Sequence, residues 1–289
     1  MLFSELEEVL EDLSRNKQRL TVSRHAYNIL LQDDEIFEPD KKQNRSGGDP
    51  SSTLVNQLFQ NLYETAESSI WMRLGAEKEK LAEYFHGQEN AEACTVAVLA
   101  LLQEQLEEKA RCRQQDKGCS FFVRLSKPVL EALASDELRK DAAFYGDKVG
   151  NYLKALLEEY CALPYAERER IYYKQQLQSI ELAITRQEKL KLTLSSRKKP
   201  TGGAAAPNNI TYLKPLCIQK DTEQLYNYLV GMTSAQPGGP WGMGCVRLSS
   251  IKKLSSLKCS GFISADDRRK IAETVSYTHL RAHETKANL

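Results

Sequence analysis

The sequence has no long apolar run, no paired cysteines and no export signal. No uninterrupted apolar stretch approaches the roughly 18 residues that a membrane-spanning helix needs. The start, Met1 to Glu8, is acidic and amphipathic and lacks the basic and apolar regions of a signal peptide. The seven cysteines include no Cys-x-x-Cys pair, which argues against a disulfide framework or a structural zinc site. We therefore expect a cytoplasmic protein with reduced thiols and no membrane partner.

The sequence also lacks a recognisable catalytic constellation. It has only four histidines, and no Ser/His/Asp order or Cys/His pair stands out. Gly238-Gly239 lacks the strand-then-helix context of a phosphate-binding loop. His279 and His283 are four residues apart, as metal ligands on a helix can be, but no preceding cysteine pair completes a zinc finger. We therefore expect no enzymatic activity, no cofactor and no metal site.

The net charge of +1 conceals an asymmetry between two parts of the chain. Residues 1–173 carry 22 Lys and Arg against 31 Asp and Glu, a net of −9, whereas residues 174–260 carry 13 against 4, a net of +9. A charge split of this size bears on partners rather than on fold. The second part could therefore meet a polyanion, and the first part as a whole would repel one.

Two similar patterns follow one another in the first 161 residues. Residues 17–23 alternate like a strand, Ser23 suits the N-cap of a helix over about 24–36, and Ser52 that of a helix over about 53–72. Residues 74–113 indicate one or two connecting helices. The same order of strand, helix, turn and helix recurs about 103 residues later, over 121–125, 127–140 and 148–161.

The remainder of the chain has a different pattern. Residues 165–188 predict a helix. Short strand-like runs follow over 189–194, 210–218, 225–232, 243–248 and 251–254. A helix followed by about five short strands at this spacing is typical of a small, partly open barrel. The predicted fold class is therefore α+β.

The two strand–helix–helix patterns resemble ribbon-helix-helix modules, and residues 165–257 are similar to the WYL domain, a small Sm/SH3-like barrel of prokaryotic regulators. The family's naming triplet is Trp-Tyr-Leu, and Asn227 replaces its Trp. Val246 replaces the Phe of the family's Phe-Arg-Leu-x-x-Ile segment. The matching segments are Tyr212-Leu213-Lys214-Pro215, Asn227-Tyr228-Leu229 and Val246-Arg247-Leu248-Ser249-Ser250-Ile251.

This order of modules resembles the WYL accessory proteins found beside RNA-targeting type VI CRISPR nucleases, and related Firmicute regulators. Residues 150–160 and 163–173 carry the most specific match, and the resemblance covers about 15–70 and 120–260. It implies that the barrel binds nucleic acid or a nucleotide and that the protein controls transcription or modulates a CRISPR effector. It implies no catalysis.

The predicted barrel strands interleave basic and aromatic side chains. Basic residues follow phosphates, and aromatic rings offer stacking faces to unpaired bases. The alternative is that the tyrosines form the barrel core and the lysines its wet exterior. Trp241 lies in a predicted loop and either covers the barrel or packs against it. The candidate residues for binding single-stranded RNA or a nucleotide-like ligand are Lys191, Arg197, Tyr212, Lys214, Tyr226, Tyr228 and Arg247.

A second candidate site is the outward face of the first predicted strand, with Lys17, Arg19 and Thr21, together with Ser52 at a helix start. In ribbon-helix-helix proteins two such strands pair and enter the DNA major groove, and a helix start can bind phosphate through free N–H groups. The acidic surroundings favour instead a face used only for dimerisation. In the second copy Phe122 occupies an outward position, which is better explained by pairing against another element than by base reading. The two copies could pair within the chain or across a homodimer.

We expect four domains: a ribbon-helix-helix-like unit with connecting helices (1–118), a second such unit (119–164), a WYL-like barrel with its leading helix (165–260) and the start of a C-terminal segment (261–274). Residues 275–289 resemble the translated sequencing-adapter tail of metagenomic reading frames. We therefore expect the natural protein to continue differently after about Thr274, with its C-terminal segment missing from this sequence.

The function that we expect is that of a non-catalytic nucleic-acid-binding regulator, homodimeric, with a CRISPR effector as a possible protein partner. Two alternatives stay open. One is a ligand-sensing transcriptional regulator that binds duplex DNA through the ribbon-helix-helix units. The other is an oligomerisation scaffold.

Overall fold

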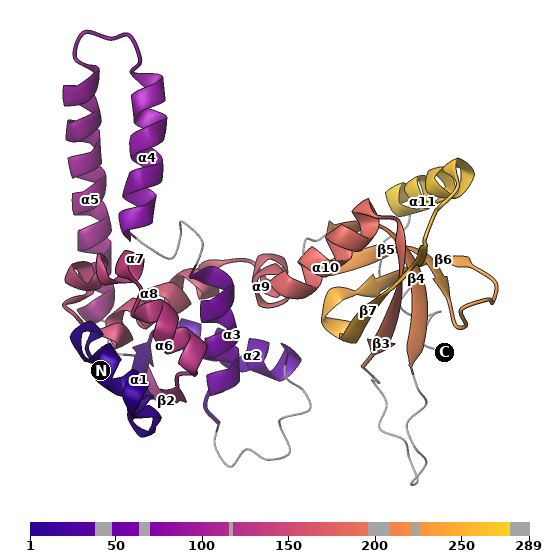
Figure 1. Cartoon of the computed structure of the whole chain (residues 1–289), viewed down its shortest axis with the longest axis horizontal. Helices are drawn as coiled ribbons and strands as arrows, with labels where there is room; N and C mark the ends of the chain where they lie inside the picture. The colour runs from indigo at the N-terminus through magenta and orange to yellow at the C-terminus, as the bar shows by residue number, and fades with distance from the viewer. Residues whose placement is uncertain (38–47, 64–69, 116–117, 196–208, 221–225, 278–289) are drawn as a thin grey trace. The chain divides into compact units, whose positions relative to one another are not determined.

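The computed structural model describes residues 1–37, 48–63, 70–115, 118–195, 209–220 and 226–277 (Figure 1). The chain divides into two compact units, Met1–Leu163 and Pro164–Leu289. Helices and antiparallel strands occur together, which confirms the α+β class. A search of the described helices finds none with the length and apolar character that crossing a membrane requires.

Two strands far apart in the sequence pair in the first unit. β1 (Lys17–Val22) runs antiparallel to β2 (Cys119–Arg124), with Lys17 opposite Arg124 and Val22 opposite Cys119. Each strand alternates between buried and more exposed residues, as the period of two requires. The two copies of the strand pattern therefore pair within the chain, which is one of the two arrangements that the sequence left open.

Helices surround this strand pair. Leu20, Leu30, Leu58 and Leu130 are fully buried between the pair and its helices, and α8 packs against β1 and α2. The helical elements of this part are η1 (Phe3–Glu5), α1 (Leu6–Glu11), η2 (Leu13–Arg15), α2 (Arg24–Phe37), α3 (Ser52–Leu62), α6 (Lys127–Leu133), α7 (Asp136–Arg139), η5 (Ala142–Tyr145) and α8 (Val149–Ala162).

The helix caps differ in part from those expected. The Ser23 hydroxyl accepts a hydrogen bond from the Ala26 N–H at 3.1 Å, as predicted for the start of α2. At α3, however, the N-cap is Ser51, whose hydroxyl accepts from the Leu54 N–H at 3.0 Å. The prediction that Ser52 is the cap was wrong because Ser51 holds the extended backbone conformation that a cap requires.

A helical hairpin connects the two copies. α4 (Ile70–Tyr84) and α5 (Ala91–Gln115) lie side by side and run in opposite directions (Figure 1). The turn between them includes Gly87 at φ +82°, a conformation that glycine adopts without steric cost.

The second unit begins with two helices, α9 (Tyr165–Tyr172) and α10 (Lys174–Thr185), so the single helix expected over 165–188 is broken at Tyr173. A five-stranded antiparallel sheet follows, in the order β6-β5-β4-β3-β7. Its strands are β3 (Glu188–Leu194), β4 (Ile210–Lys220), β5 (Asn227–Ser234), β6 (Gly242–Arg247) and β7 (Ile251–Ser260).

The sheet is curled but not closed. β6 and β7 form opposite edges, yet only η6 (Leu248–Ser250) separates them in the chain. A flat five-stranded sheet is about 19 Å wide, whereas the four peptide steps from Arg247 to Ile251 span at most about 14 Å. The edges must therefore bend toward each other. No ladder joins β6 to β7 in the described residues, so a closed barrel is not found.

Each face of the sheet packs a helix. Leu190, Leu192 and Leu213 are fully buried on the face that α10 contacts. On the other face, Tyr228 and Val230 of β5 form a buried cluster with Ile263 and Ile271, the latter from α11 (Ala265–Tyr277). The segment after the sheet thus belongs to the core of the second unit.

Candidate nucleic-acid interface

One face of β3 and β4 carries basic and aromatic side chains. Lys191 stands directly opposite Tyr212 in the β3–β4 ladder, so the two side chains share a face. Strand alternation places Lys189 and Lys214 on this same face. The leucines that alternate with them, such as Leu190, are buried on the other face. Three positive charges and a tyrosine are therefore adjacent on the side of the sheet away from α10.

A tryptophan lies between two of these lysines. Trp241 precedes β6, and its ring centroid is 5.5 Å from Lys189 Nζ and 4.9 Å from Lys214 Nζ. Both distances suit a cation–π contact, and all three side chains are partly exposed. We call Lys189, Lys214 and Trp241 the lysine–tryptophan cluster. It offers an aromatic face and two ammonium groups within one small area.

A second cationic–aromatic group surrounds Arg247 at the end of β6. Its guanidinium carbon lies 3.6 Å from the ring centroid of Tyr226 and 5.9 Å from that of Tyr165. Arg247 Nη2 donates to Tyr165 Oη at 3.4 Å, and Arg247 Nε is buried with no hydrogen-bond partner in the described part of the chain. Burial, followed by the negative charge of Glu169, raises the pKa of Tyr165 to about 12. The phenol is thus neutral near pH 7, and it accepts the hydrogen bond from Arg247.

Glu169 of α9 holds the start of β5 in place. Its carboxylate accepts hydrogen bonds from the Asn227 N–H at 2.9 Å, from Asn227 Nδ2 at 2.8 Å and from the Ser249 N–H at 3.1 Å. Asn227 Nδ2 also donates to the Ala166 carbonyl at 2.7 Å. Both Glu169 and Asn227 are fully buried. Burial raises the pKa of Glu169, and the bonds from Asn227 and Ser249 and the charge of Arg247 oppose that rise.

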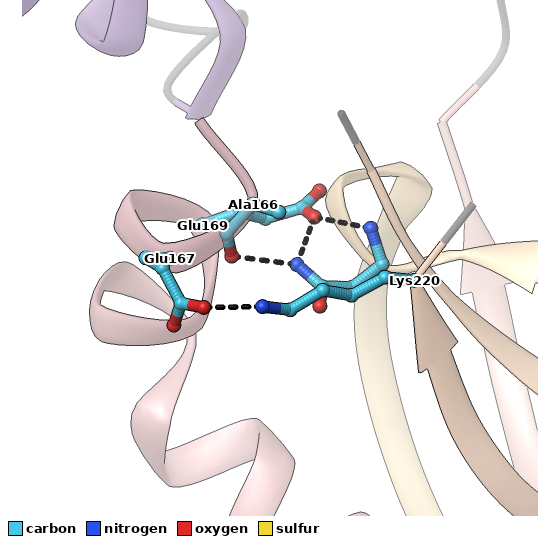
Figure 2. Close-up of polar contacts among 5 residues, drawn as sticks. Ala166, Glu167, Glu169 and Lys220 are labelled. Atoms are coloured by element: carbon cyan, nitrogen blue, oxygen red, sulfur yellow. Dashed lines mark hydrogen bonds and ion pairs between the residues drawn. The ribbon is translucent and has the colours of Figure 1, made fainter. Parts of the chain in front are cut away.

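A neighbouring ion pair lies beside this buried network. Figure 2 shows Glu167, also on α9, directed at Lys220 at the end of β4. About two fifths of each side chain is exposed. Glu167 and Glu169 thus tie one helix to two strands, and they position Tyr165, and through it Arg247, at this end of the sheet.

The predicted barrel residues therefore fall into separate places. Lys191, Tyr212 and Lys214 share one face of β3 and β4, and Tyr226 packs under Arg247. Tyr228 is only 1% exposed and belongs to the hydrophobic cluster with Ile263 and Ile271. Its ring is therefore a core group and offers no stacking surface. Arg197 lies outside the described residues.

Three of the four predicted ribbon residues, Lys17, Arg19 and Thr21, lie on the outward face of β1. Arg19 stands opposite Phe122 in the β1–β2 ladder, and Phe122 is 55% exposed. Lys17 Nζ lies 4.4 Å from the Phe122 ring centroid, and the Thr21 and Ser120 hydroxyls are 2.8 Å apart. The Ser52 hydroxyl accepts a hydrogen bond from the Arg124 N–H at 2.9 Å. It therefore ties α3 to β2, which leaves this oxygen engaged within the fold.

Sequence reasoning missed two residues of the second unit. The sequence does not show which side of the sheet Trp241 contacts, because a tryptophan in a Pro/Gly loop has no periodicity to place it. Glu169 is one of several acids in a charged helix, and only the fold shows that it is buried under Asn227. No group of three or more His, Cys, Asp or Glu in the described ranges could hold a metal ion, and His279 and His283 lie outside those ranges.

Comparison with known proteins gives a fold relative. No protein-family model matches this chain, and no curated protein matches it. Among solved structures, the chain is similar to one described as "Crystal structure of a CRISPR Cas-related protein". The TM-score is 0.64 and the identity 18%, over 90% of this chain and 70% of that chain. At this identity the likeness shows a shared fold, and it extends over both units.

Proposed function

We propose that this chain is a non-catalytic nucleic-acid-binding regulatory protein whose second unit binds single-stranded RNA or a nucleotide-like ligand. The observation that carries the proposal is the lysine–tryptophan cluster on the face of β3 and β4. Ammonium groups attract phosphates, and an indole face stacks on an unpaired base whatever its sequence. Tyr212 and Lys191 extend the same surface along the two strands.

The distribution of charge supports the same unit. Residues 164–289 carry 20 Lys and Arg against 10 Asp and Glu, and residues 1–163 carry 20 against 29. A polyanion is therefore attracted to the second unit and repelled by the first as a whole.

The biological setting that we propose is that of a cytoplasmic accessory protein of a CRISPR system, acting on an RNA-targeting effector. The similar solved structure is of a CRISPR Cas-related protein, and the order of sequence motifs resembles that of WYL accessory proteins. The chain's part in such a system would be to hold RNA near the effector, without chemistry of its own.

Fluorescence anisotropy of the full chain tests the binding proposal. The probes are single-stranded RNA, single-stranded DNA and duplex DNA, each at several salt concentrations. For the variant Lys189→Ala/Lys214→Ala we expect RNA binding to weaken at least about tenfold at 0.1 M salt and the salt slope to fall by about 1.4, because each phosphate contact to a single strand contributes about 0.7. Trp241→Ala should weaken binding while leaving the salt slope nearly unchanged.

The matched control is Lys80→Ala/Lys127→Ala, which removes two positive charges from exposed helix positions of the first unit. It should bind RNA like the parent. If the Lys189→Ala/Lys214→Ala variant also binds like the parent, the lysine–tryptophan cluster is not the binding site.

A second candidate function rests on the β1–β2 ribbon. Its outward strip has Lys17 opposite Arg124 and Arg19 opposite Phe122, all four exposed, and basic side chains on a two-stranded ribbon can read base edges in the major groove. The duplex probe decides between the two sites. A preference for duplex DNA that Arg19→Ala abolishes would make the protein a DNA-binding regulator.

A further inference from the structure

The helical hairpin of the first unit has an apolar surface of its own. Residues 94–102 of α5 include no charged residue and only one polar residue, Thr95. A helix that is apolar around its circumference has to be covered on more than one side, and along the hairpin its partner is α4. Val96 and Leu101 remain 62% and 61% exposed.

The exposed apolar residues form a continuous stripe. Ala93, Val96, Ala97 and Ala100 are all exposed, and their spacing of three and four places them on adjoining turns of one side of α5. Leu101 extends the stripe farther around the helix. Such a stripe matches the side that a helix presents to a helical partner.

A groove between the two helices adjoins this stripe. Its volume is about 720 Å³, and α5 contributes Thr95, Val96, Leu99 and Ala100 to it. α4 contributes small residues, Gly75 and Ala82, beside Leu74. A Cβ added at Gly75 would meet no atom within 4 Å. The small side chains leave room for a neighbouring helix to approach closely.

The charges at the margins of the groove identify its occupant. Lys78 lies on the α4 side and Glu92 on the α5 side. A two-fold axis that lays α4 of one copy against α5 of another brings each Lys78 toward the Glu92 of the other copy, so the surface is complementary to itself. We propose that the α4–α5 groove is the homodimer interface of this protein, formed by a second copy of the same hairpin.

The dimensions of the hairpin set the expected strength of this contact. The 15 residues of α4 are about 22 Å long, and two helices side by side are about 20 Å across. A face of this size lies at the small end of specific interfaces, so dimerisation in the micromolar range is expected. The proposal is independent of nucleic-acid binding, because it concerns the first unit alone.

Sedimentation velocity of the full chain, without nucleic acid, tests the interface between about 1 and 200 μM. The parent should shift from monomer to dimer within this range. Val96→Glu should weaken dimerisation by more than about tenfold, because it places a charge against an apolar partner. Val96 is exposed, so circular dichroism and the melting temperature of this variant should match the parent.

Exchange of the charges of Lys78 and Glu92 distinguishes a lost contact from a folding defect, because the double variant should recover what the single variant loses. Lys78→Glu alone should weaken dimerisation, because it sets two acids against each other, and Lys78→Glu/Glu92→Lys should restore it. The control is Lys80→Glu, the same change on the same helix at an exposed position outside the groove. A monomeric parent at 200 μM would assign the groove to a different partner and overturn the proposal. So would a dimer that neither Val96→Glu nor Lys78→Glu weakens.

Discussion

Single buried polar residues decide how the second unit is held together. Glu169 brings a carboxylate into a fully buried position, where desolvation alone would be unfavourable. Three N–H donors, two from Asn227 and one from Ser249, surround it. The Asn227 side-chain amide also donates to the Ala166 carbonyl, so removal of Glu169 takes the carboxylate acceptor chiefly from two backbone N–H groups, those of Asn227 and Ser249.

We predict that Glu169→Ala lowers the free energy of unfolding by about 3 kcal/mol, since buried donors that lose their acceptor cost about 1–3 kcal/mol each. Urea unfolding followed by circular dichroism measures the change. The matched control is Glu167→Ala, two residues away on the same helix, whose partly exposed pair with Lys220 should contribute less than about 1 kcal/mol. Equal losses for both variants would contradict the assigned role of the buried network.

The raised pKa of Glu169 predicts a pH dependence of stability. Between the ordinary glutamate value of 4.5 and the higher value in the fold, the folded chain binds more protons than the unfolded chain, so this group's contribution to stability falls as pH rises. Relative to Glu169→Gln, which cannot titrate, the wild type should lose stability from about pH 4.5 upward. Urea titrations at several pH values measure the free energy of unfolding of both proteins. If the wild-type value minus the Glu169→Gln value stays constant or increases with pH, the predicted pH dependence is wrong.

At the scale of elements, a bulge shapes the sheet. The β4–β5 register shifts between Pro215 and Cys217, and Gly231 of β5 lies against that point. A Cβ built on Gly231 would lie 2.1 Å from the Lys214 carbonyl oxygen, which no side chain can accommodate. The glycine therefore permits the close approach of two strands beside the lysine–tryptophan cluster.

Gly231→Ala should destabilise the protein by about 2 kcal/mol or more, because the backbone of β4 has to move, and it should weaken RNA binding because Lys214 moves with it. Thermal unfolding and the anisotropy assay measure the two effects. Gly238→Ala, in the β5–β6 turn with no atom within 4 Å of the added Cβ, serves as the control and should change neither. An unchanged melting temperature for Gly231→Ala would contradict this close approach of the two strands.

Several elements could be predicted from the sequence and some of their ends could not. The strand-like stretches over residues 17–23 and 121–125 predicted both strands, because a strand with one buried face alternates in polarity along its own sequence. The break at Tyr173 between α9 and α10 was not predicted, because the apolar periodicity runs through it. Ser51 and Ser52 are equally good caps by composition, and Asp34, which accepts from the Ser51 N–H and hydroxyl, favours the first of them.

At the scale of the whole molecule, the two units differ in charge, with a net of −9 in residues 1–163 and +10 in residues 164–289. In hydrogen exchange of the full chain with single-stranded RNA, we therefore expect slower exchange in peptides that cover β3, β4 and the turn before Trp241. Exchange in β1 and β2 should not change. Protection confined to β1 and β2 would instead move the nucleic-acid site to the ribbon.

The α+β class, the two strand–helix–helix patterns and the concentration of positive charge in the second part can be predicted from the sequence alone, because periodicity and charge are local properties of the chain. The tertiary fold determines which residues meet. It paired β1 with β2 across about 100 residues of chain, buried Tyr228 in the core, and set Trp241 between Lys189 and Lys214. Register, sheet curvature and helix packing bring these groups together, and each depends on contacts between segments far apart in sequence.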